Sequence, residues 1–76
     1  MENIHRSEAL DKLIGKRVEI EFYDNETAVG ILGWNEDRGR YSMSGCEYYD
    51  DTGNPMMANT GEILFRKSHV KRFMRR

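Results

Sequence analysis

The sequence predicts a small, mainly β protein in which one short N-terminal helix precedes antiparallel strands that bend into a barrel. Three observations support this fold class. The apolar residues change from helical spacing to strict alternation near residue 16. Turn residues separate the alternating runs. Glycine recurs inside one predicted strand, which is typical of bent sheets. The 76 residues are expected to form one domain, 1–76, because one core needs on the order of 50 to 200 residues.

Residues 8–14 are predicted to form the helix. Ser7 can cap its first turn, where Glu8 suits the helix dipole, and Gly15 can end it in a left-handed conformation. Three apolar residues share one face at the spacing i, i+3, i+4: Leu10, Leu13 and Ile14. This helix is too short to be stable alone, so we expect its apolar face to pack on the sheet.

The next two strands form a predicted hairpin. Apolar and charged residues alternate over 16–22, which indicates a strand with one buried face. Asp24 and Asn25 are turn residues, and β-type composition resumes over 27–34. Gly30 and Gly33 in the second strand indicate a bulge, a bend or a close backbone approach.

Three further strands complete the expected sheet. A polar turn at 35–39 leads to a strand at 40–43, and the last two strands are expected at 62–66 and 70–74. The segment 44–61, which precedes these two strands, is the least regular: it contains Gly45, Gly53, Asn54, Pro55 and Asn59 and has a net charge of −3. It is expected to be either a long variable loop or an extended hairpin that turns near residues 51–54.

Charge is divided unevenly along the chain. The net charge of −1 excludes a strongly cationic nucleic-acid clamp as a description of the whole protein. However, residues 62–76 carry six basic side chains against Glu62 alone, whereas 1–43 and 44–61 are each net −3. The C-terminal strand pair is therefore the electropositive element.

The core is expected to be small. Leu, Ile, Val and Phe supply 15 of the 76 residues, close to the one-fifth level below which chains tend towards disorder. Cys46 is the only cysteine, which excludes an intrachain disulfide, and with only His5 and His69 beside it a closed zinc site would have to recruit carboxylates. Oligomerisation is therefore the expected source of additional burial.

Two segments carry a family resemblance. IGKRVEIEFYDNETAVGIL (14–32) and GEILFRKSHVKRF (61–73), with a helix before and a variable loop between them, resemble the Sm-like (LSm) family, which includes the bacterial RNA chaperone Hfq. The first family motif is matched by Val18, Ile20, Phe22, Asp24, Gly30 and Leu32. The second is matched by Phe65, Arg66, Lys67, Ser68, His69 and Val70. The resemblance covers residues 10–73 except 44–59.

The resemblance implies a fold, an assembly and a ligand. In this family a helix packs on a five-stranded, strongly bent antiparallel SH3-like barrel. Subunits join through strands four and five into homo-oligomeric rings of five to seven copies, and single-stranded RNA binds at the pore. Two motifs of the family's RNA pocket differ here. Its Asp-x-x-x-Asn pattern falls on Glu36, Arg38 and Arg40, and the glycine of its second motif falls on Lys67.

The candidate RNA-binding residues lie in two turns. Arg66, Lys67 and His69 fall in the last turn, which the resemblance places at the pore, where several copies would form an anion-attracting collar. Arg38, Arg40 and Tyr41 can stack on unpaired bases. Alternatively, Tyr41 packs in the barrel and the two arginines pair with Glu36 and Asp37. The basic tail can extend an RNA path or serve solubility alone: Lys71, Arg72, Arg75 and Arg76.

The remaining aromatic residues favour other roles. Trp34 is expected in the core rather than as an exposed base platform. Tyr48 and Tyr49 stand beside Asp50 and Asp51, which repel phosphate, so they suit an exposed loop or a protein partner better than RNA. The second functional hypothesis is accordingly a ring-forming scaffold or protein-interaction module without RNA binding, which the net charge and the two altered pocket positions favour.

Catalysis is not expected. His69 with Glu62, Asp50 or Cys46 shows no paired metal-ligand spacing and no glycine-rich phosphate loop, so neither a cofactor nor a metal is predicted. His5 is expected to be solvent-exposed. No apolar run of about 18 residues exists, and no apolar signal region follows the charged first residues, so a cytoplasmic protein is expected.

Overall fold

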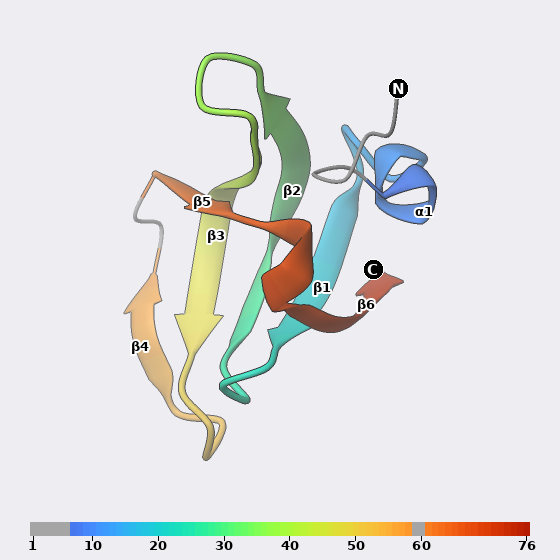
Figure 1. Cartoon of the computed structure of the whole chain (residues 1–76). Coiled ribbons are helices and arrows are strands. Elements are labelled where there is room, and N and C mark those ends of the chain that lie inside the picture. Colours follow the sequence, from blue (N-terminus) through green and yellow to red (C-terminus); the bar gives the residue numbers. More distant parts are fainter. Residues whose placement is uncertain (1–6, 59–60) are drawn as a thin grey trace.

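The computed structural model describes residues 7–58 and 61–76, which form one helix, six strands and one 3-10 helix (Figure 1). In chain order these are α1 (Glu8–Asp11), β1 (Arg17–Phe22), β2 (Thr27–Asn35), β3 (Arg40–Tyr49), β4 (Pro55–Ala58), β5 (Glu62–Phe65), η1 (Lys67–His69) and β6 (Val70–Arg75). All strand pairs are antiparallel, so the predicted mainly β fold is confirmed. His5 lies outside the described residues.

The strand order of the sheet is β4-β3-β2-β1-β6, and β5 also pairs with β3. The first half of β3 pairs with β5 and its last residues pair with β4. The sequence predicted one strand after β3, at 62–66, which is β5. The structure has a further strand, β4, that pairs with the end of β3. The segment 44–61 is not one long loop, because β3 extends to Tyr49 and the chain reverses within residues 50–54. The extended-hairpin alternative is confirmed.

The sheet bends where Gly30 of β2 faces Gly45 and Cys46 of β3. The register shifts between Val29 and Ile31, because two β3 residues oppose one β2 residue there. A Cβ atom on Gly30 would lie 2.8 Å from the Ser44 carbonyl oxygen and from Met43 Cγ. Gly45 has a φ of +55°, which favours glycine. The predicted bulge and close backbone approach at Gly30 are confirmed.

The helix α1 is shorter than the predicted 8–14. Ser7 Oγ accepts the Leu10 N–H at 3.3 Å, as predicted for the cap. Beyond Asp11 the backbone bonds become i→i+3, from Leu13 to the Leu10 carbonyl and from Ile14 to the Asp11 carbonyl, so the α-helix ends and tighter turns follow. Leu10 is buried, whereas Ile14 is exposed rather than part of the buried face.

The core lies between the helix and the concave face of the sheet. Its members come from α1 and from strands β1, β2, β3 and β5: Leu10, Val18, Ile20, Phe22, Ala28, Leu32, Tyr41, Met43, Cys46 and Phe65. The alternation predicted for β1 is confirmed, since Val18, Ile20 and Phe22 are buried while the residues between them are not. Trp34 packs against this cluster with its ring centroid 4.9 Å from that of Tyr41, in agreement with the predicted core role.

Candidate nucleic-acid interface

The basic turn, defined as Arg66 to His69, joins β5 to β6. Arg66 and His69 are exposed and Lys67 is half-buried. The His69 N–H donates to the Arg66 carbonyl at 3.0 Å, which closes the turn, and the Tyr23 N–H donates to the His69 carbonyl at 2.9 Å. The second bond attaches the basic turn to the end of β1. The predicted placement of these three side chains between the last two strands is confirmed, and their backbone is held at two points.

Arg38 and Arg40 lie at the β2–β3 turn. Asn35 organises this turn, because its side-chain Oδ1 accepts the Arg38 N–H and its carbonyl accepts the Gly39 N–H, both at 2.9 Å. The Arg40 guanidinium donates to the carbonyls of Arg38 and Gly39. It therefore contacts its own turn rather than forming the ion pairs with Glu36 and Asp37 that one alternative predicted.

Two of the predicted RNA-binding groups adjoin each other through strand pairing. Phe65 of β5 is the Cα partner of Tyr41 of β3. Because the strands are antiparallel, Arg66, which follows Phe65, continues beside Arg40, which precedes Tyr41. Both turns therefore adjoin the same end of the β3–β5 pair.

Tyr41 is not available to RNA, so its prediction as a stacking residue is wrong. Its side chain is fully buried, with 0% exposure, because it packs between Trp34 and Phe65 in the core. Its hydroxyl accepts the Ser7 N–H at 2.7 Å and donates to Asp11 Oδ1 at 2.7 Å. The alternative interpretation, that Tyr41 packs in the barrel, is confirmed.

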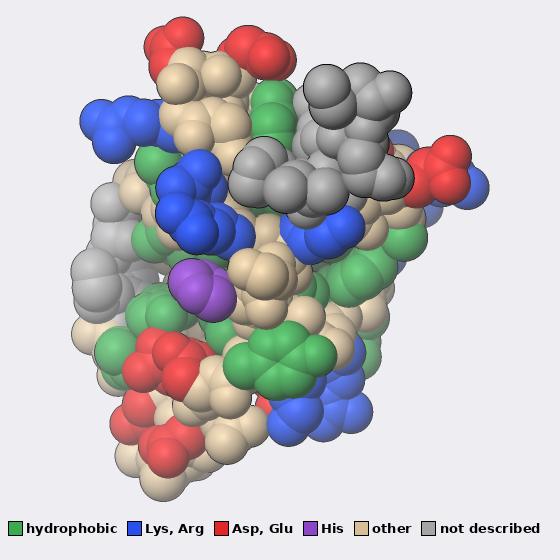
Figure 2. All heavy atoms as spheres, in the orientation of Figure 1, with side chains coloured by type: hydrophobic (Ala, Val, Ile, Leu, Met, Phe, Trp, Pro, Cys, Tyr) green, Lys and Arg blue, Asp and Glu red, His purple; other side chains and the backbone are tan. Residues whose placement is uncertain are grey.

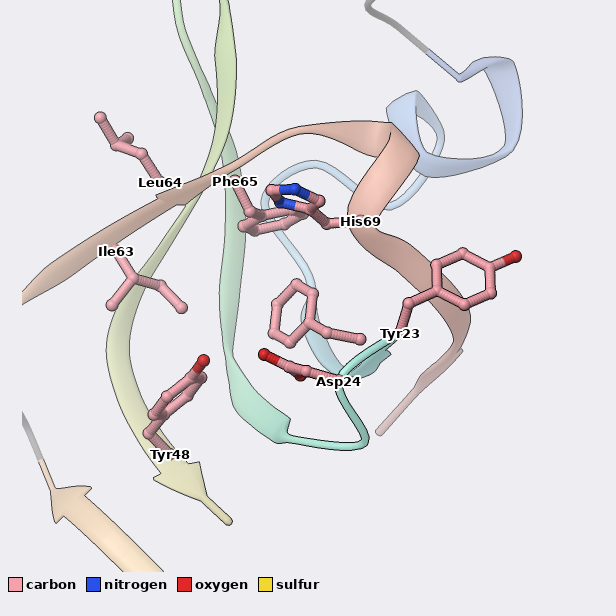
Figure 3. Close-up of a pocket in the computed structure, with 8 residues that line it drawn as sticks. Tyr23, Asp24, Tyr48, Ile63, Leu64, Phe65 and His69 are labelled. Atoms are coloured by element: carbon pink, nitrogen blue, oxygen red, sulfur yellow. The ribbon is translucent and has the colours of Figure 1, made fainter. Parts of the chain in front are cut away.

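A groove of about 430 Å³ opens beside the basic turn (Figure 3). The sequence analysis did not identify it. It is lined by the end of β1 and its turn, by β3, β5 and η1: Phe22, Tyr23, Asp24, Tyr48, Ile63, Leu64, Phe65 and His69. Phe22 and Phe65 are buried and pack edge to face, with centroids 5.3 Å apart, so they form an aromatic floor. Tyr23 is 67% exposed at the mouth.

Polar groups surround this aromatic floor. Figure 3 shows the Asp24 carboxylate pointing towards the middle of the groove, with His69 and Tyr48 on other sides. The Tyr48 hydroxyl donates to Glu26 Oε1 at 2.6 Å. Burial, followed by this hydrogen bond, raises the pKa of Tyr48 well above its usual range, so the hydroxyl stays protonated at neutral pH. Asp24 Oδ1 accepts the Glu26 N–H at 3.0 Å, which fixes the carboxylate on the turn.

The surface around the basic turn is divided by charge. In Figure 2, Lys and Arg side chains gather above His69 and acidic side chains gather below it. The groove therefore lies between a cationic region and an anionic region. A ligand seated there can place an anionic group against the basic turn and hydrogen-bond donors against Asp24.

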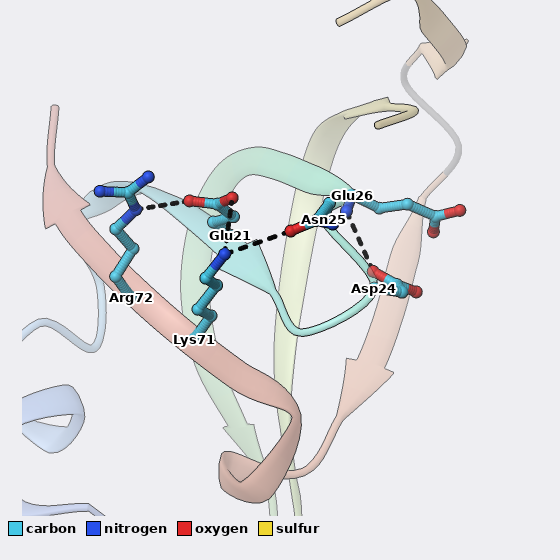
Figure 4. A network of polar contacts seen from close by, with 6 residues as sticks. All are labelled: Glu21, Asp24, Asn25, Glu26, Lys71 and Arg72. Carbon is cyan, nitrogen blue, oxygen red and sulfur yellow. Dashed lines mark hydrogen bonds and ion pairs between the residues drawn. The ribbon is translucent and has the colours of Figure 1, made fainter. Parts of the chain in front are cut away.

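The basic residues of β6 are largely matched by β1. Arg72 Nε donates to Glu21, and Lys71 Nζ lies 3.8 Å from Glu21 Oε2 and 3.2 Å from Asn25 Oδ1 (Figure 4). The Arg72 hydrogen bond is the main cause that lowers the pKa of Glu21. Arg76 lies 3.3 Å from Glu19. The C-terminal tail is thus less cationic than its sequence suggests, since part of its charge is paired within the sheet.

Tyr48 and Tyr49 belong to strand β3 rather than to the loop where they were expected. Tyr48 packs against the core, and the Tyr49 hydroxyl donates to Glu47 Oε1 at 3.0 Å. Cys46 is buried in the core, so its thiol is not exposed at the surface. Among residues 7–58 and 61–76, no group of three or more His, Cys, Asp or Glu side chains is placed to hold a metal ion.

In the described part of the chain, no helix has the length and apolar character needed to cross a membrane. The expected cytoplasmic location stays a prediction. No protein-family model and no curated protein sequence matches this chain. Its fold, however, is similar to those of several solved structures.

Two of these structures are archaeal Sm proteins. One is the Sm protein of Pyrococcus abyssii in complex with a uridine heptamer, with 16% identity, a TM-score of 0.69 and coverage of 90% of this chain and 93% of that one. The other is a heptameric archaeal Sm protein, with 23% identity, a TM-score of 0.66 and coverage of 91% and 97%. A chain of the NatC complex bound to CoA is also similar, with 18% identity, a TM-score of 0.60 and coverage of 86% and 80%. The protein therefore has an Sm-like fold.

Proposed function

We propose that this protein assembles into a homo-oligomeric ring of five to seven copies and binds single-stranded RNA at the pore through the basic turn. It acts by binding rather than by catalysis, in the cytoplasm. The observation that carries the proposal is the position of the basic turn, which joins β5 to β6, two strands that each have an open edge. The similarity to a heptameric Sm protein and to an Sm protein bound to uridine supports both parts.

The open edges support assembly. Within the described residues, β5 pairs only with β3 and β6 only with β1, so each has one edge of unpaired backbone groups. Such edges favour pairing with another chain. Pairing β5 of one copy with β6 of the next is a head-to-tail contact, which closes into a ring when the rotation per copy fits.

The side chains on the two edges are complementary. β5 carries the acidic Glu62 and the exposed Leu64, while β6 carries three basic residues and the exposed Met74. Pairing the strands brings opposite charges near each other and places the two exposed apolar side chains, Leu64 and Met74, beside the neighbouring copy. The small core makes this additional burial more important than it would be in a larger domain.

Assembly also gives the basic turn its function. Each copy contributes Arg66 and Lys67 at the connection between the two interface strands, so a ring repeats these cations around a common axis. Repeated cations bind the RNA backbone mainly by releasing counterions, which makes affinity fall steeply with salt. Arg40 precedes Tyr41 and Arg66 follows Phe65, the last pair of the β3–β5 register, so Arg40 adds a cation at the same end of this strand pair.

Native mass spectrometry with and without short uridine-rich and adenine-rich oligonucleotides tests the proposal, because it reports stoichiometry and ligand together. A single oligomer of five to seven copies that takes up oligonucleotide is expected. Gel shifts at two salt concentrations should show weaker binding at the higher one, and Arg66→Ala with Lys67→Ala should reduce the salt dependence by about one counterion per lost phosphate contact. Lys12→Ala, an exposed cation on the helix side, is the control. An intact ring that binds no oligonucleotide at low salt would refute the RNA function.

A second candidate is a ring-forming or hetero-oligomeric protein-interaction module without RNA binding. The similarity to a chain of the NatC complex, a multi-subunit assembly, favours it, as do the net charge of −1 and the altered pocket positions Arg40 and Lys67. This candidate uses the Tyr48 and Tyr49 end of β3 as its contact surface. Copurified partners that are retained after Tyr49→Ala, which leaves the core side of β3 intact, would count against it.

A further inference from the structure

We propose that the groove beside the basic turn binds a guanine base of the single-stranded RNA, with the Asp24 carboxylate accepting hydrogen bonds from guanine N1–H and N2–H. This inference rests on the proposed RNA-binding function and adds a base-specific site to it. The site differs from the family pocket described by the resemblance, whose positions here fall on Glu36, Arg38 and Arg40 at the β2–β3 turn and on Lys67 in the basic turn, because none of these four residues lines the groove.

The size and lining of the groove suit a base. Its volume of about 430 Å³ falls in the range of small-molecule sites, which combine an apolar lining with a few convergent polar groups. Phe22 and Phe65 give a buried apolar floor, and the exposed His69 and Tyr23 add aromatic rings at the mouth. Unpaired RNA bases are held in proteins by stacking on exposed rings such as these two, with about 1 to 3 kcal/mol for each base.

Asp24 determines which base fits. An ionised carboxylate only accepts hydrogen bonds, so it favours a base edge that presents donors. Guanine presents two adjacent donors, N1–H and N2–H, whereas uracil presents the single N3–H between two carbonyl oxygens that the carboxylate repels. The bond from the Glu26 N–H uses only Asp24 Oδ1, which leaves Oδ2 and a second lone pair on Oδ1 as acceptors within the described part of the chain.

The turn geometry holds Asp24 ready for this contact. The Asn25 N–H donates to the Phe22 carbonyl at 2.8 Å, and the Phe22 N–H donates to the Glu26 carbonyl at 2.8 Å, so the turn is closed on the floor of the groove. The Tyr48 hydroxyl fixes Glu26 from β3. A carboxylate fixed in advance loses less conformational entropy on binding than a mobile one.

The basic turn brings RNA to the groove. His69 belongs to both, and Arg66 directly follows Phe65 of the aromatic floor. A nucleotide with its base in the groove can thus place its phosphate towards Arg66 and Lys67, away from Asp24 and Glu26. The acidic side of the groove then faces the base, where it discriminates, rather than the phosphate, which it would repel.

The first experiment compares heptamers that differ at one base. Affinities of the assembled wild-type protein are measured for UUUUUUU, UUUGUUU and UUUIUUU, in which inosine lacks the N2 amine but keeps N1–H. Guanine is expected to bind about tenfold more tightly than uracil, the effect of one bidentate contact, with inosine between them. Equal affinity for the three oligonucleotides would overturn the inference while leaving the proposed RNA function intact. Absence of binding to all three would overturn both.

The second experiment replaces Asp24 with asparagine. Asp24→Asn keeps an oxygen for the Glu26 N–H but places an amide donor opposite the guanine donors. The guanine heptamer should then bind more weakly while the uridine heptamer binds slightly more tightly, because a negative charge has been removed. Asp51→Asn, which removes one charge at the exposed β3–β4 turn, is the control and should preserve the preference.

Weaker binding of the guanine heptamer together with tighter binding of the uridine heptamer distinguishes base recognition by Asp24 from two other roles. If Asp24 only repels phosphate, Asp24→Asn strengthens binding of all heptamers equally, which refutes the inference. If a neighbouring copy fills the groove in the ring, the substitution changes the stability of the ring in native mass spectra and leaves the guanine preference unchanged, which also refutes it.

Discussion

The Tyr41 hydroxyl donates a hydrogen bond to Asp11 Oδ1 at 2.7 Å and accepts one from the Ser7 N–H, so it joins the start of β3 to both ends of the N-terminal helix. The two residues are 30 positions apart in the sequence. A four-residue helix is not stable alone, since nucleating a helix costs more free energy than so few backbone hydrogen bonds provide. This contact, together with buried Leu10, therefore holds the helix on the sheet.

Tyr41→Phe is expected to destabilise the protein by about 1 to 3 kcal/mol, because it removes a bond to a carboxylate and leaves a part-buried amide without this acceptor. Urea denaturation of the assembled protein measures the effect. Oligonucleotide affinity should not change, since the residue is buried. If Tyr41 stacked on bases instead, Phe would keep the ring and both stability and affinity would be preserved.

The sequence predicts this fold well because its signals are local. Alternation in β1, the Asp24–Asn25 turn and the glycine in β2 each act over a few residues, and each is confirmed. The function of Tyr41 could not be predicted in the same way. Its position beside Arg38 and Arg40 left both base stacking and packing in the barrel open, whereas pairing with Phe65 and contact with Trp34 place it in the core.

The groove could not be predicted from the sequence either, because it also depends on contacts between distant segments. Its lining comes from β1, β3, β5 and η1, and these segments meet only through non-local strand pairing. One sequence signal was present, since exposed Tyr23 follows the last buried residue of β1 and directly precedes the turn residue Asp24. The pairing of Arg76 with Glu19 and of Arg72 with Glu21 could likewise not be predicted from the sequence, because it depends on the β1–β6 register.

Gly30→Ala is expected to destabilise the sheet by about 1 to 3 kcal/mol or more, since the new methyl group would lie 2.8 Å from the Ser44 carbonyl oxygen. A backbone atom cannot move aside without distorting the bulge. Gly33→Ala is the matched comparison in the same strand. Its methyl group meets only the rotatable Ser42 Oγ, also at 2.8 Å, so the cost should be smaller. Equal losses of unfolding free energy in urea would show that the close backbone approach is not the cause.

Acid should weaken the β1–β6 pairing. The Arg72 hydrogen bond lowers the pKa of Glu21 below its ordinary value of 4.5, so its ionised form is favoured in the folded state. The corresponding stability is present above the unfolded pKa and is lost as the pH falls through the lower folded pKa. Urea denaturation from pH 7 to pH 3 measures this loss. Asp50, whose pKa is also lowered, chiefly by its hydrogen bond from Thr52, contributes to the same acid range.

Arg72→Gln removes the partner and should reduce the dependence of stability on pH below about 4.5, while the contribution of Asp50 remains. Arg75→Gln, which removes a charge from the same strand, is the control and should keep the wild-type dependence. The difference in pH dependence between Arg72→Gln and the wild type should shrink in high salt, because Arg72 is exposed and its interaction with Glu21 is screened. An identical pH profile for Arg72→Gln and the wild type would contradict the role of this pair.

Leu64→Lys should dissociate the proposed ring without unfolding the chain. Leu64 is 39% exposed on the open edge strand β5, where a new cation would face the basic β6 of the neighbouring copy. Ile31→Lys is the matched control, because Ile31 is 40% exposed but lies on β2, which has β1 and β3 on its two sides. Native mass spectrometry should therefore show smaller species for Leu64→Lys and an unchanged oligomer for Ile31→Lys, with the circular dichroism spectrum of each variant like that of the wild type. Dissociation by both substitutions, or by neither, would show that assembly does not use the β5 edge.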